Sequence, residues 1–270
     1  MKEENVTRKD IVRVLLNTLE PLDYVHAFYE GGAAAFNRID EWSDIDLYVV
    51  ADDNKVEETF LAAENALRTL SPIERKLRTP QLSWPGVFQT FYKLEKASEF
   101  LLVDFAVIQQ NASEKFLEPR VHGNVTFYFN KNSSVKPAVF DPEEFQERLR
   151  QRLGLLQARF DMFNNLVQKE INRSNSLEAI EWYHNFTLAM LVEALRIKHN
   201  PMHHNFRMRY VHYELPPETI RKLEELFFVK DARDLQEKFD KATKWFQETI
   251  SENDQSLKKL GTTSERKFVC

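Results

Sequence analysis

Cysteine, glycine and long apolar runs are all scarce in this chain. The only cysteine among the 270 residues is Cys270, so an intramolecular disulfide framework is excluded. The strand-like apolar run at 47–51 spans five residues, against the ~20 that a membrane helix needs. Residues 1–5 have no apolar segment typical of a secretory signal. We therefore expect no membrane span and a place in the reducing cytoplasm.

Positive charge is also in deficit. The chain has 37 Lys and Arg against 42 Asp and Glu, a net charge of -5 at pH 7. The acidic excess lies entirely in residues 1–140, which hold 16 basic and 21 acidic residues. This balance gives no support to general nucleic-acid binding, and it favours a small molecule as partner.

The pattern of the chain changes near residues 136–142. There, two prolines and Asp141, a residue suited to capping, precede a long stretch at helical spacing. The length also suggests two domains, at roughly 150 residues each. We place the domains at 1–140 and 141–270, and expect either a monomer or a homodimer.

The two parts differ in their periodicity. In the first, helical spacing predicts helices over 7–20 and 56–70. Short runs between turn residues predict strands over 22–29, 45–50, 87–94, 100–108 and 125–130. The second part predicts helices over 142–171, 177–198, 217–228 and 231–250, with a frayed tail from Ser251. The predicted fold class is α+β, a small mixed-sheet domain followed by a C-terminal helical bundle.

Two short motifs lie close together in the first part. Gly31 and Gly32 directly follow a predicted strand, and glycine allows backbone N–H groups to converge on an anion. Asp44 and Asp46 enter the next strand at i and i+2, so both carboxylates point to one face, about 7 Å apart at ~3.3 Å per residue. Taken alone, each motif is explained better by an ordinary solvated turn.

A third acid changes this balance. Asp104 interrupts an otherwise apolar strand, where an unpaired carboxylate costs several kcal/mol or becomes protonated. A metal shared with Asp44 and Asp46 would be its partner; a salt bridge to Lys or Arg is the weaker alternative. Mg²⁺ prefers oxygen ligands and leaves positions for phosphates. The three acids together predict a site for one or two Mg²⁺ ions.

This order of motifs resembles that of the nucleotidyltransferase superfamily that includes DNA polymerase beta. Its pattern is a Gly-Gly or Gly-Ser turn, Asp-x-Asp after about ten residues, and a third acid on a later strand. The run 38–47 is especially similar to small bacterial members, among them the aminoglycoside and lincosamide nucleotidyltransferases. The resemblance extends over residues 22–108 by motif and beyond 141 by architecture alone. Asn37 stands where these enzymes often have glycine, but asparagine tolerates left-handed backbone angles.

The resemblance implies transfer of a nucleoside monophosphate, by default AMP from ATP, to a hydroxyl of a small acceptor such as an aminoglycoside- or lincosamide-like antibiotic. It implies that Asp44 and Asp46 bind metal, and that Asp104 completes a second metal position or acts as base. The residues implied to bind the nucleotide are Gly31, Gly32, Ser43 and Arg38, the last of which is equally well a solvated arginine. Two alternatives stay open: a toxin-antitoxin component acting on protein or RNA, and a nucleotide sensor without turnover.

Residues 194–213 form a second candidate region, rich in basic residues and without an acid. We expect either phosphate contacts or an ordinary basic helix end from Arg196, Lys198, Arg207 and Arg209. In the helix before them, Glu181 and His184 share a face and offer either a general base or a solvated pair. Arg207 and His212 have the Arg-x4-His spacing of a family of helical ribonucleases, which a segment this rich in both residues also produces by chance.

Overall fold

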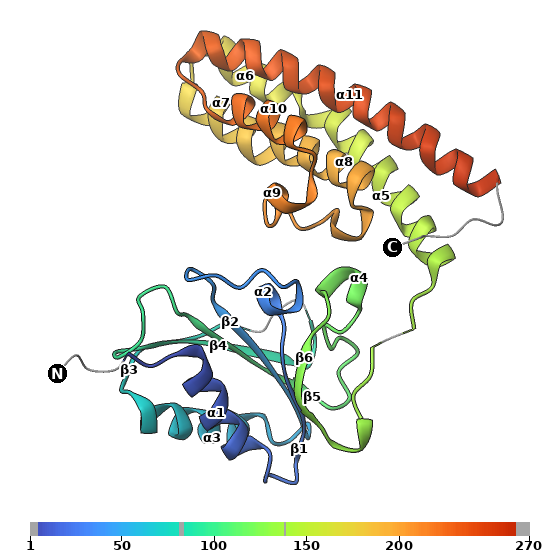
Figure 1. Ribbon diagram of the computed structural model, residues 1–270. Coiled ribbons are helices and arrows are strands. Elements are labelled where there is room, and N and C mark those ends of the chain that lie inside the picture. The colour runs from blue at the N-terminus through green and yellow to red at the C-terminus, as the bar shows by residue number, and fades with distance from the viewer. Residues whose placement is uncertain (1–4, 81–83, 138, 263–270) are drawn as a thin grey trace. The chain divides into compact units, whose positions relative to one another are not determined.

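The computed structural model describes residues 5–80, 84–137 and 139–262. The chain divides into two compact units, with the boundary between Phe140 and Asp141. The first unit contains a six-stranded mixed sheet with helices, and the described residues of the second form helices without strands (Figure 1). The predicted fold class, a mixed-sheet part followed by a helical part, is confirmed.

The sheet of the first unit has the strand order β3-β4-β5-β2-β1-β6. β2 and β5 run parallel, and the other neighbouring pairs are antiparallel. The parallel pair lies in the middle of the sheet, so its side chains have strands on both sides. The strands are β1 (Val25–Glu30), β2 (Ile45–Ala51), β3 (Ile73–Arg78), β4 (Val87–Leu94), β5 (Val103–Gln109) and β6 (Thr126–Asn130).

Helices α1 (Arg8–Leu19) and α3 (Val56–Leu70) cover one face of this sheet (Figure 1). Alternate residues of β2 are buried against them, namely Ile45, Leu47 and Val49. Because side chains alternate along a strand, Asp46 and Tyr48 point to the opposite face. We call this second face the carboxylate face.

The carboxylate face is covered over only part of its area. A small core packs on it, formed by Tyr29, Val50, Ile108, Leu117 and Val135 among others. The short helix α4 (Pro119–His122) follows Leu117 in the chain. Asp46 and Asp104 lie outside this core, toward the N-terminal ends of β2 and β5, and the short helix α2 (Gly32–Ala35) contacts β2 beside them.

The second unit is built from helices around one apolar cluster. Asp141 caps the first of them by accepting hydrogen bonds from the backbone of Glu143 and Glu144. A π-helical turn, Tyr183–Leu188, joins two helices into one continuous segment. The helices are α5 (Pro142–Phe163), α6 (Asn165–Asn172), α7 (Ser176–Trp182), α8 (Ala189–His199), α9 (Val211–Glu214), α10 (Pro217–Phe227) and α11 (Ala232–Thr262).

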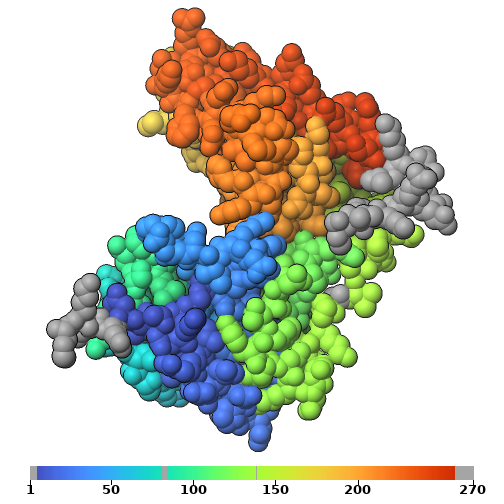
Figure 2. All heavy atoms as spheres, in the orientation of Figure 1, coloured from blue at the N-terminus to red at the C-terminus, as the bar shows by residue number. Residues whose placement is uncertain are grey.

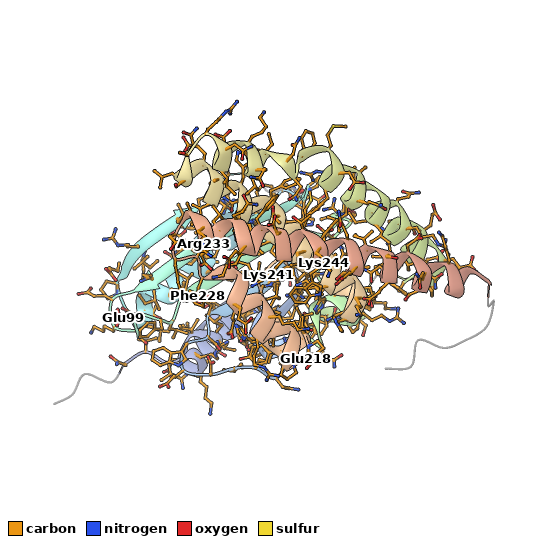
Figure 3. The ribbon with its side chains drawn as sticks, turned by 90° about the horizontal axis from the view of Figure 1, so that it is seen from above. Glu99, Glu218, Phe228, Arg233, Lys241 and Lys244 are labelled. Carbon is orange, nitrogen blue, oxygen red and sulfur yellow. The ribbon has the colours of Figure 1, made fainter. Side chains whose placement is uncertain are left out.

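Helix α11 corrects the prediction of a frayed tail from Ser251. The helix continues to Thr262, because Asn253 and Leu257 are buried and the Asn253 side chain donates to a backbone carbonyl of α8 at 2.8 Å. Residues 263–270 lie outside the described residues. Arg233, Lys241 and Lys244 are among the exposed cations of α11 (Figure 3).

Among the strands of the described residues, β3 alone was not predicted by the sequence pattern. Glu74, Arg75 and Lys76 are exposed and charged, so no apolar alternation marks the strand. It is held at the edge of the sheet by pairing with β4. Among the described residues, the structure contains no helix that is both long and apolar enough to cross a membrane.

Candidate active site

Two carboxylates meet across the central parallel strands. Asp46 of β2 is the register partner of Asp104 of β5, so their side chains lie side by side on the carboxylate face. Both residues are partly buried, whereas Asp44, one residue before β2, is exposed. The structure thus brings the three predicted acids to one end of the strand pair.

Asp104 is held by a neutral partner. The Nε2 of Gln89 donates to both carboxylate oxygens, at 2.7 and 2.8 Å. Burial raises the pKa of Asp104 to about 7; the Gln89 hydrogen bonds oppose the rise, and the charges of Asp46 and Asp44 add to it. Partial desolvation of its carboxylate also raises the pKa of Asp44, although a hydrogen bond from the Leu102 backbone and the charge of Arg8 oppose the rise. Within the described part of the chain, the partner of Asp104 is an amide, not the Lys or Arg of the alternative.

The raised pKa of Asp104 predicts a pH dependence of stability. Unfolding returns this carboxyl to its ordinary pKa of about 4. The folded state therefore binds the proton more tightly, and the free energy of unfolding should fall as pH rises from ~4 to the pKa of about 7. At about 1.4 kcal/mol per pKa unit, the fall amounts to a few kcal/mol.

Thermal unfolding of the wild type and Asp104→Asn between pH 4 and pH 8 measures this contribution. In buffer without divalent cations, the free energy of unfolding of Asp104→Asn should not fall over this pH range. The variant should then be more stable than the wild type above pH 7. The same dependence on pH in both proteins would contradict the prediction.

Gly31 and Gly32 bring the backbone against Asp46. The Gly31 N–H donates to the carbonyl oxygen of Asp46 at 3.0 Å. Gly32 has a φ of +53°, and a Cβ on it would lie 1.7 Å from Oδ2 of Asp46. Only glycine permits this approach with a left-handed φ. The glycine turn and the Asp-x-Asp motif therefore form one site.

The loop between the turn and β2 lies at the surface of the first unit, in blue in Figure 2. Asn37 has a φ of 54°, which confirms that asparagine takes a left-handed angle here. The Arg38 guanidinium lies 4.9 Å from the centroid of the Phe36 ring. The Ser43 Oγ accepts from the Asp40 N–H at 2.9 Å and donates to its Oδ1 at 2.6 Å, which orders the loop.

Arg8, at the start of α1, fixes the backbone that enters β2. Its guanidinium donates to the carbonyl oxygens of Ser43, at 3.2 Å, and of Asp44. It is also ion-paired with Glu30, which is 4% exposed and accepts from the Tyr128 hydroxyl. Sequence reasoning missed this network. The sequence feature that could have indicated it is Glu30, a carboxylate that ends an apolar strand directly before the glycine pair.

Removal of the Arg8 guanidinium should destabilise the first unit strongly. Arg8→Met leaves Glu30 buried without a cation, which costs about 3–5 kcal/mol. Tyr128→Phe removes one hydrogen bond from the same carboxylate and should cost about 1–2 kcal/mol. Chemical denaturation compares the two variants, and Arg8→Met/Glu30→Gln should recover most of the loss. Equal stability of Arg8→Met and Tyr128→Phe would show that the ion pair does not hold the fold.

The acids fit a divalent cation in type and charge. Repulsion from Asp46 and Asp44 contributes to the raised pKa of Asp104, and a cation among them would relieve that repulsion. No three His, Cys, Asp or Glu side chains of the described residues already surround a common metal position. Mg²⁺ commonly takes one or two carboxylates and completes its shell with water and substrate phosphates, so this arrangement is sufficient for it.

In the second unit, Arg196 belongs to the buried framework. Its side chain is fully buried and donates to Glu214 and to the carbonyl oxygens of Arg207 and Arg209, the first two at 2.7 Å each. Burial raises the pKa of Glu214, but Arg196 and His203 outweigh burial and hold it below its usual range. The expectation that Arg196 contacts phosphate does not hold, because no surface of this side chain is accessible. Glu214 lies one residue beyond the segment that sequence analysis described as free of acids.

The other predicted residues of this unit lie in its packing or at its surface. The Lys198 Nζ is 2.8 Å from Oε2 of Glu252. The His184 Nε2 is 3.0 Å from the Phe227 carbonyl oxygen, and the two rings stack. The exposed residues are Lys198, Glu181, Arg207, Arg209 and His212. None of their predicted roles is tested by these positions.

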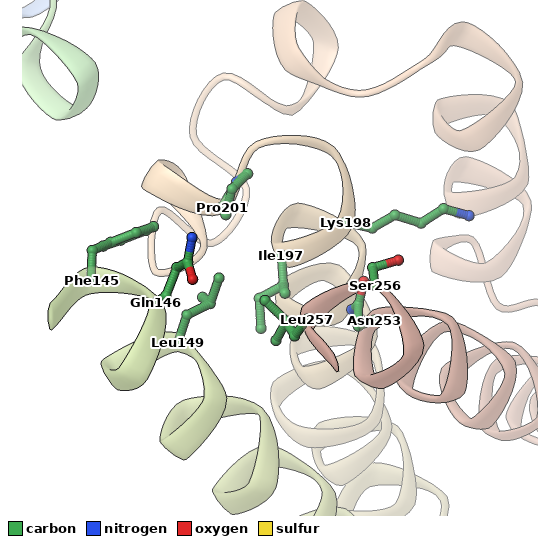
Figure 4. A pocket seen from close by; sticks show the side chains of 9 residues that line it. All are labelled: Phe145, Gln146, Leu149, Ile197, Lys198, Pro201, Asn253, Ser256 and Leu257. Carbon is green, nitrogen blue, oxygen red and sulfur yellow. The ribbon is translucent and has the colours of Figure 1, made fainter. Parts of the chain in front are cut away.

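A cavity of about 160 Å³ lies among α5, α8 and α11 (Figure 4). Its walls are largely apolar, with Leu149, Ile197 and Leu257 among the lining residues. Of the polar side chains that line it, Lys198 is ion-paired and Asn253 is bonded to a backbone carbonyl. The candidate active site is the carboxylate site of the first unit, where Asp46 and Asp104 lie side by side.

No family model and no curated protein matches this chain. Among solved structures, it is similar to an aminoglycoside 6-adenyltransferase from Bacillus subtilis, with 14% identity over 93% of this chain and 95% of that one, at a TM-score of 0.31. It is also similar to a STING-associated CdnE c-di-GMP synthase from Capnocytophaga granulosa, with 14% identity over 94% of this chain and 84% of that one, at a TM-score of 0.29. At these TM-scores, function has to be argued from the residues of the site.

Proposed function

We propose that the chain is a Mg²⁺-dependent nucleotidyltransferase that moves AMP from ATP to a hydroxyl of a small acceptor. The observation that carries the proposal is the pairing of Asp46 with Asp104, with the Gly32 backbone packed against Asp46. Adjacent carboxylates bind the cation of a metal–triphosphate complex, and a glycine turn lets phosphate oxygens approach the backbone.

Each group has a role that follows from its place. Mg²⁺ held by Asp44 and Asp46 would neutralise the charge of the triphosphate. The Gly31 N–H is already bonded to Asp46, which leaves the N–H groups that follow it for the phosphates. Arg38 and Ser43 lie on the adjoining loop as further contacts to the nucleotide.

In the reaction, the acceptor hydroxyl oxygen forms a bond to the α-phosphorus of ATP. The bond from that phosphorus to the oxygen bridging to the β-phosphate breaks, and pyrophosphate leaves. The hydroxyl proton passes to Asp104, the carboxylate that lies beside Asp46 across the parallel strands and is free to act as a base. Positioning and charge neutralisation supply most of the catalysis in such transfers.

ATP labelled at its α-phosphate tests the proposal. The protein, Mg²⁺ and a mixture of hydroxyl compounds, with aminoglycosides and a lincosamide among them, should yield a new labelled product. One pyrophosphate should be released for each label transferred. Release of orthophosphate in place of pyrophosphate would contradict the proposal. Transfer of the label without a requirement for Mg²⁺ would contradict it as well.

A further inference from the structure

The strand order separates two sides of the carboxylate site. Gly31 and Gly32 follow β1 on one side of β2, while β5, β4 and β3 extend on the other side. In an in-line displacement, the entering and leaving oxygens lie on opposite sides of the phosphorus. If the glycine turn holds the triphosphate, the acceptor hydroxyl approaches from the side of β5 and β4, where Asp104 lies.

Two rows of side chains cross that side of the sheet. Phe91 of β4 is the register partner of Asp104, and Leu77 of β3 is the partner of Phe91. Two positions further along β4, Lys93 is the partner of Arg75. With strands ~4.8 Å apart, an apolar row reaches roughly 10 Å from Asp104, and a cationic row lies beside it.

The burial of neighbouring residues places both rows on the carboxylate face. Tyr92 and Leu94 are buried in the cluster formed with α1 and α3, so Lys93 between them points the other way. A β-bulge between Ile73 and Arg75 shifts the alternation of β3 by one residue. The bulge brings Arg75 to the same face as Lys93.

Lys93 and Arg75 differ from the other cations of β3 and β4. On the helix-covered face, the cations are already paired, Lys76 with Glu64 and Arg78 with Glu57. Arg75 is near the exposed Glu74, with 3.9 Å from Nε to Oε1, a contact worth little in water. Lys93 has no ion pair with any residue that the structure describes. Like charges opposite each other in a strand pair are unfavourable, and a bound anion would remove that cost.

On the basis of the proposed function, we infer that the acceptor is a small anionic hydroxyl compound. Its phosphate or carboxylate lies at Lys93 and Arg75, its less polar part lies along Phe91 and Leu77, and its hydroxyl reaches Asp104. The same two cations disfavour a polycationic acceptor such as an aminoglycoside.

Equilibrium binding to the full chain tests this inference. The protein is first saturated with Mg²⁺ and the non-hydrolysable donor α,β-methylene-ATP. The probes are ribose 5-phosphate, gluconate, neutral ribose and kanamycin. At least one of the two anions should bind tenfold or more tightly than ribose and kanamycin, and their order distinguishes a phosphate from a carboxylate.

Two double variants locate the effect. Lys93→Gln/Arg75→Gln should bind the preferred anion at least tenfold more weakly than the wild type. Lys9→Gln/Arg68→Gln removes the same charge from exposed positions of α1 and α3, on the other side of the sheet, and should bind it as the wild type does.

Several results would overturn the inference: no anion binding by the wild type, equal or tighter binding of ribose or kanamycin, or unchanged binding in Lys93→Gln/Arg75→Gln. Binding of α,β-methylene-ATP is measured first in every protein, because it tests the proposed function separately from the acceptor class. Its absence from the wild type would refute the proposed function itself. Its presence without any anion preference would refute the acceptor class alone.

Discussion

Asp46→Asn should reduce nucleotidyl transfer by on the order of 10³-fold and leave the fold intact. The contacts of the site converge on this residue, with Asp104 beside it and the Gly32 backbone against its Oδ2. Asparagine has nearly the same shape but no charge, so it retains the packing and loses the attraction for a hard divalent cation. The variant also relieves repulsion on Asp104, so its stability without Mg²⁺ should equal or exceed that of the wild type.

Steady-state transfer from ATP measures the loss of activity, and the circular dichroism spectrum of the variant checks that the fold is intact. Asp23→Asn is the matched control, because it makes the same chemical change at an exposed position outside the site. An Asp46→Asn protein with wild-type activity would refute the assignment of this residue.

Gly32→Ala should be almost as damaging, for a steric reason. The new Cβ would lie 1.7 Å from Oδ2 of Asp46, and alanine would be forced into a φ of +53°. Asp46 must then move, so we expect transfer to fall by roughly 100-fold or more, as for a misplaced catalytic group. The strained backbone should also lower the free energy of unfolding by about 1–3 kcal/mol.

Gly154→Ala is the matched control for this substitution. Gly154 lies in α5, where a Cβ would meet no neighbouring atom within 4 Å. Alanine is the better helix former, so this variant should gain up to about 1 kcal/mol and keep full activity. Kinetics and chemical denaturation of both glycine variants measure the contrast. Wild-type activity in Gly32→Ala would show that the close approach to Asp46 has no part in catalysis.

The elements with strong periodicity were predictable from the sequence, and those defined by pairing were not. Helix 56–70 is marked by its own apolar spacing, and the predicted range matches that of α3. β3 is an edge strand whose exposed charges resemble a loop until β4 pairs with it. The break between α5 and α6 at Asn164 leaves helical spacing intact on both sides, so the pattern predicts a single helix.

The same distinction holds at the site. Asp44, Asp46 and the glycine turn are close in sequence, so local spacing already singles them out. Gln89 was missed, because only the register of β4 and β5 brings its amide to Asp104. The position of Arg75 depends on a bulge in β3 that no residue pattern marks. For Arg196 the sequence leaves a phosphate contact and a basic helix end open, because its partner Glu214, whose side chain is 4% exposed, lies outside the basic segment.

The central claim is that Asp44 and Asp46 hold a metal-bound nucleoside triphosphate. Thermal unfolding of the wild type and Asp46→Asn with ATP, GTP, CTP and UTP, each with and without Mg²⁺, tests it without knowledge of the acceptor. Ligands that bind only the folded state raise the unfolding midpoint by mass action. The account predicts a rise with ATP that requires Mg²⁺ and is absent from Asp46→Asn. No rise with any nucleotide, or an equal rise in the variant, would contradict it.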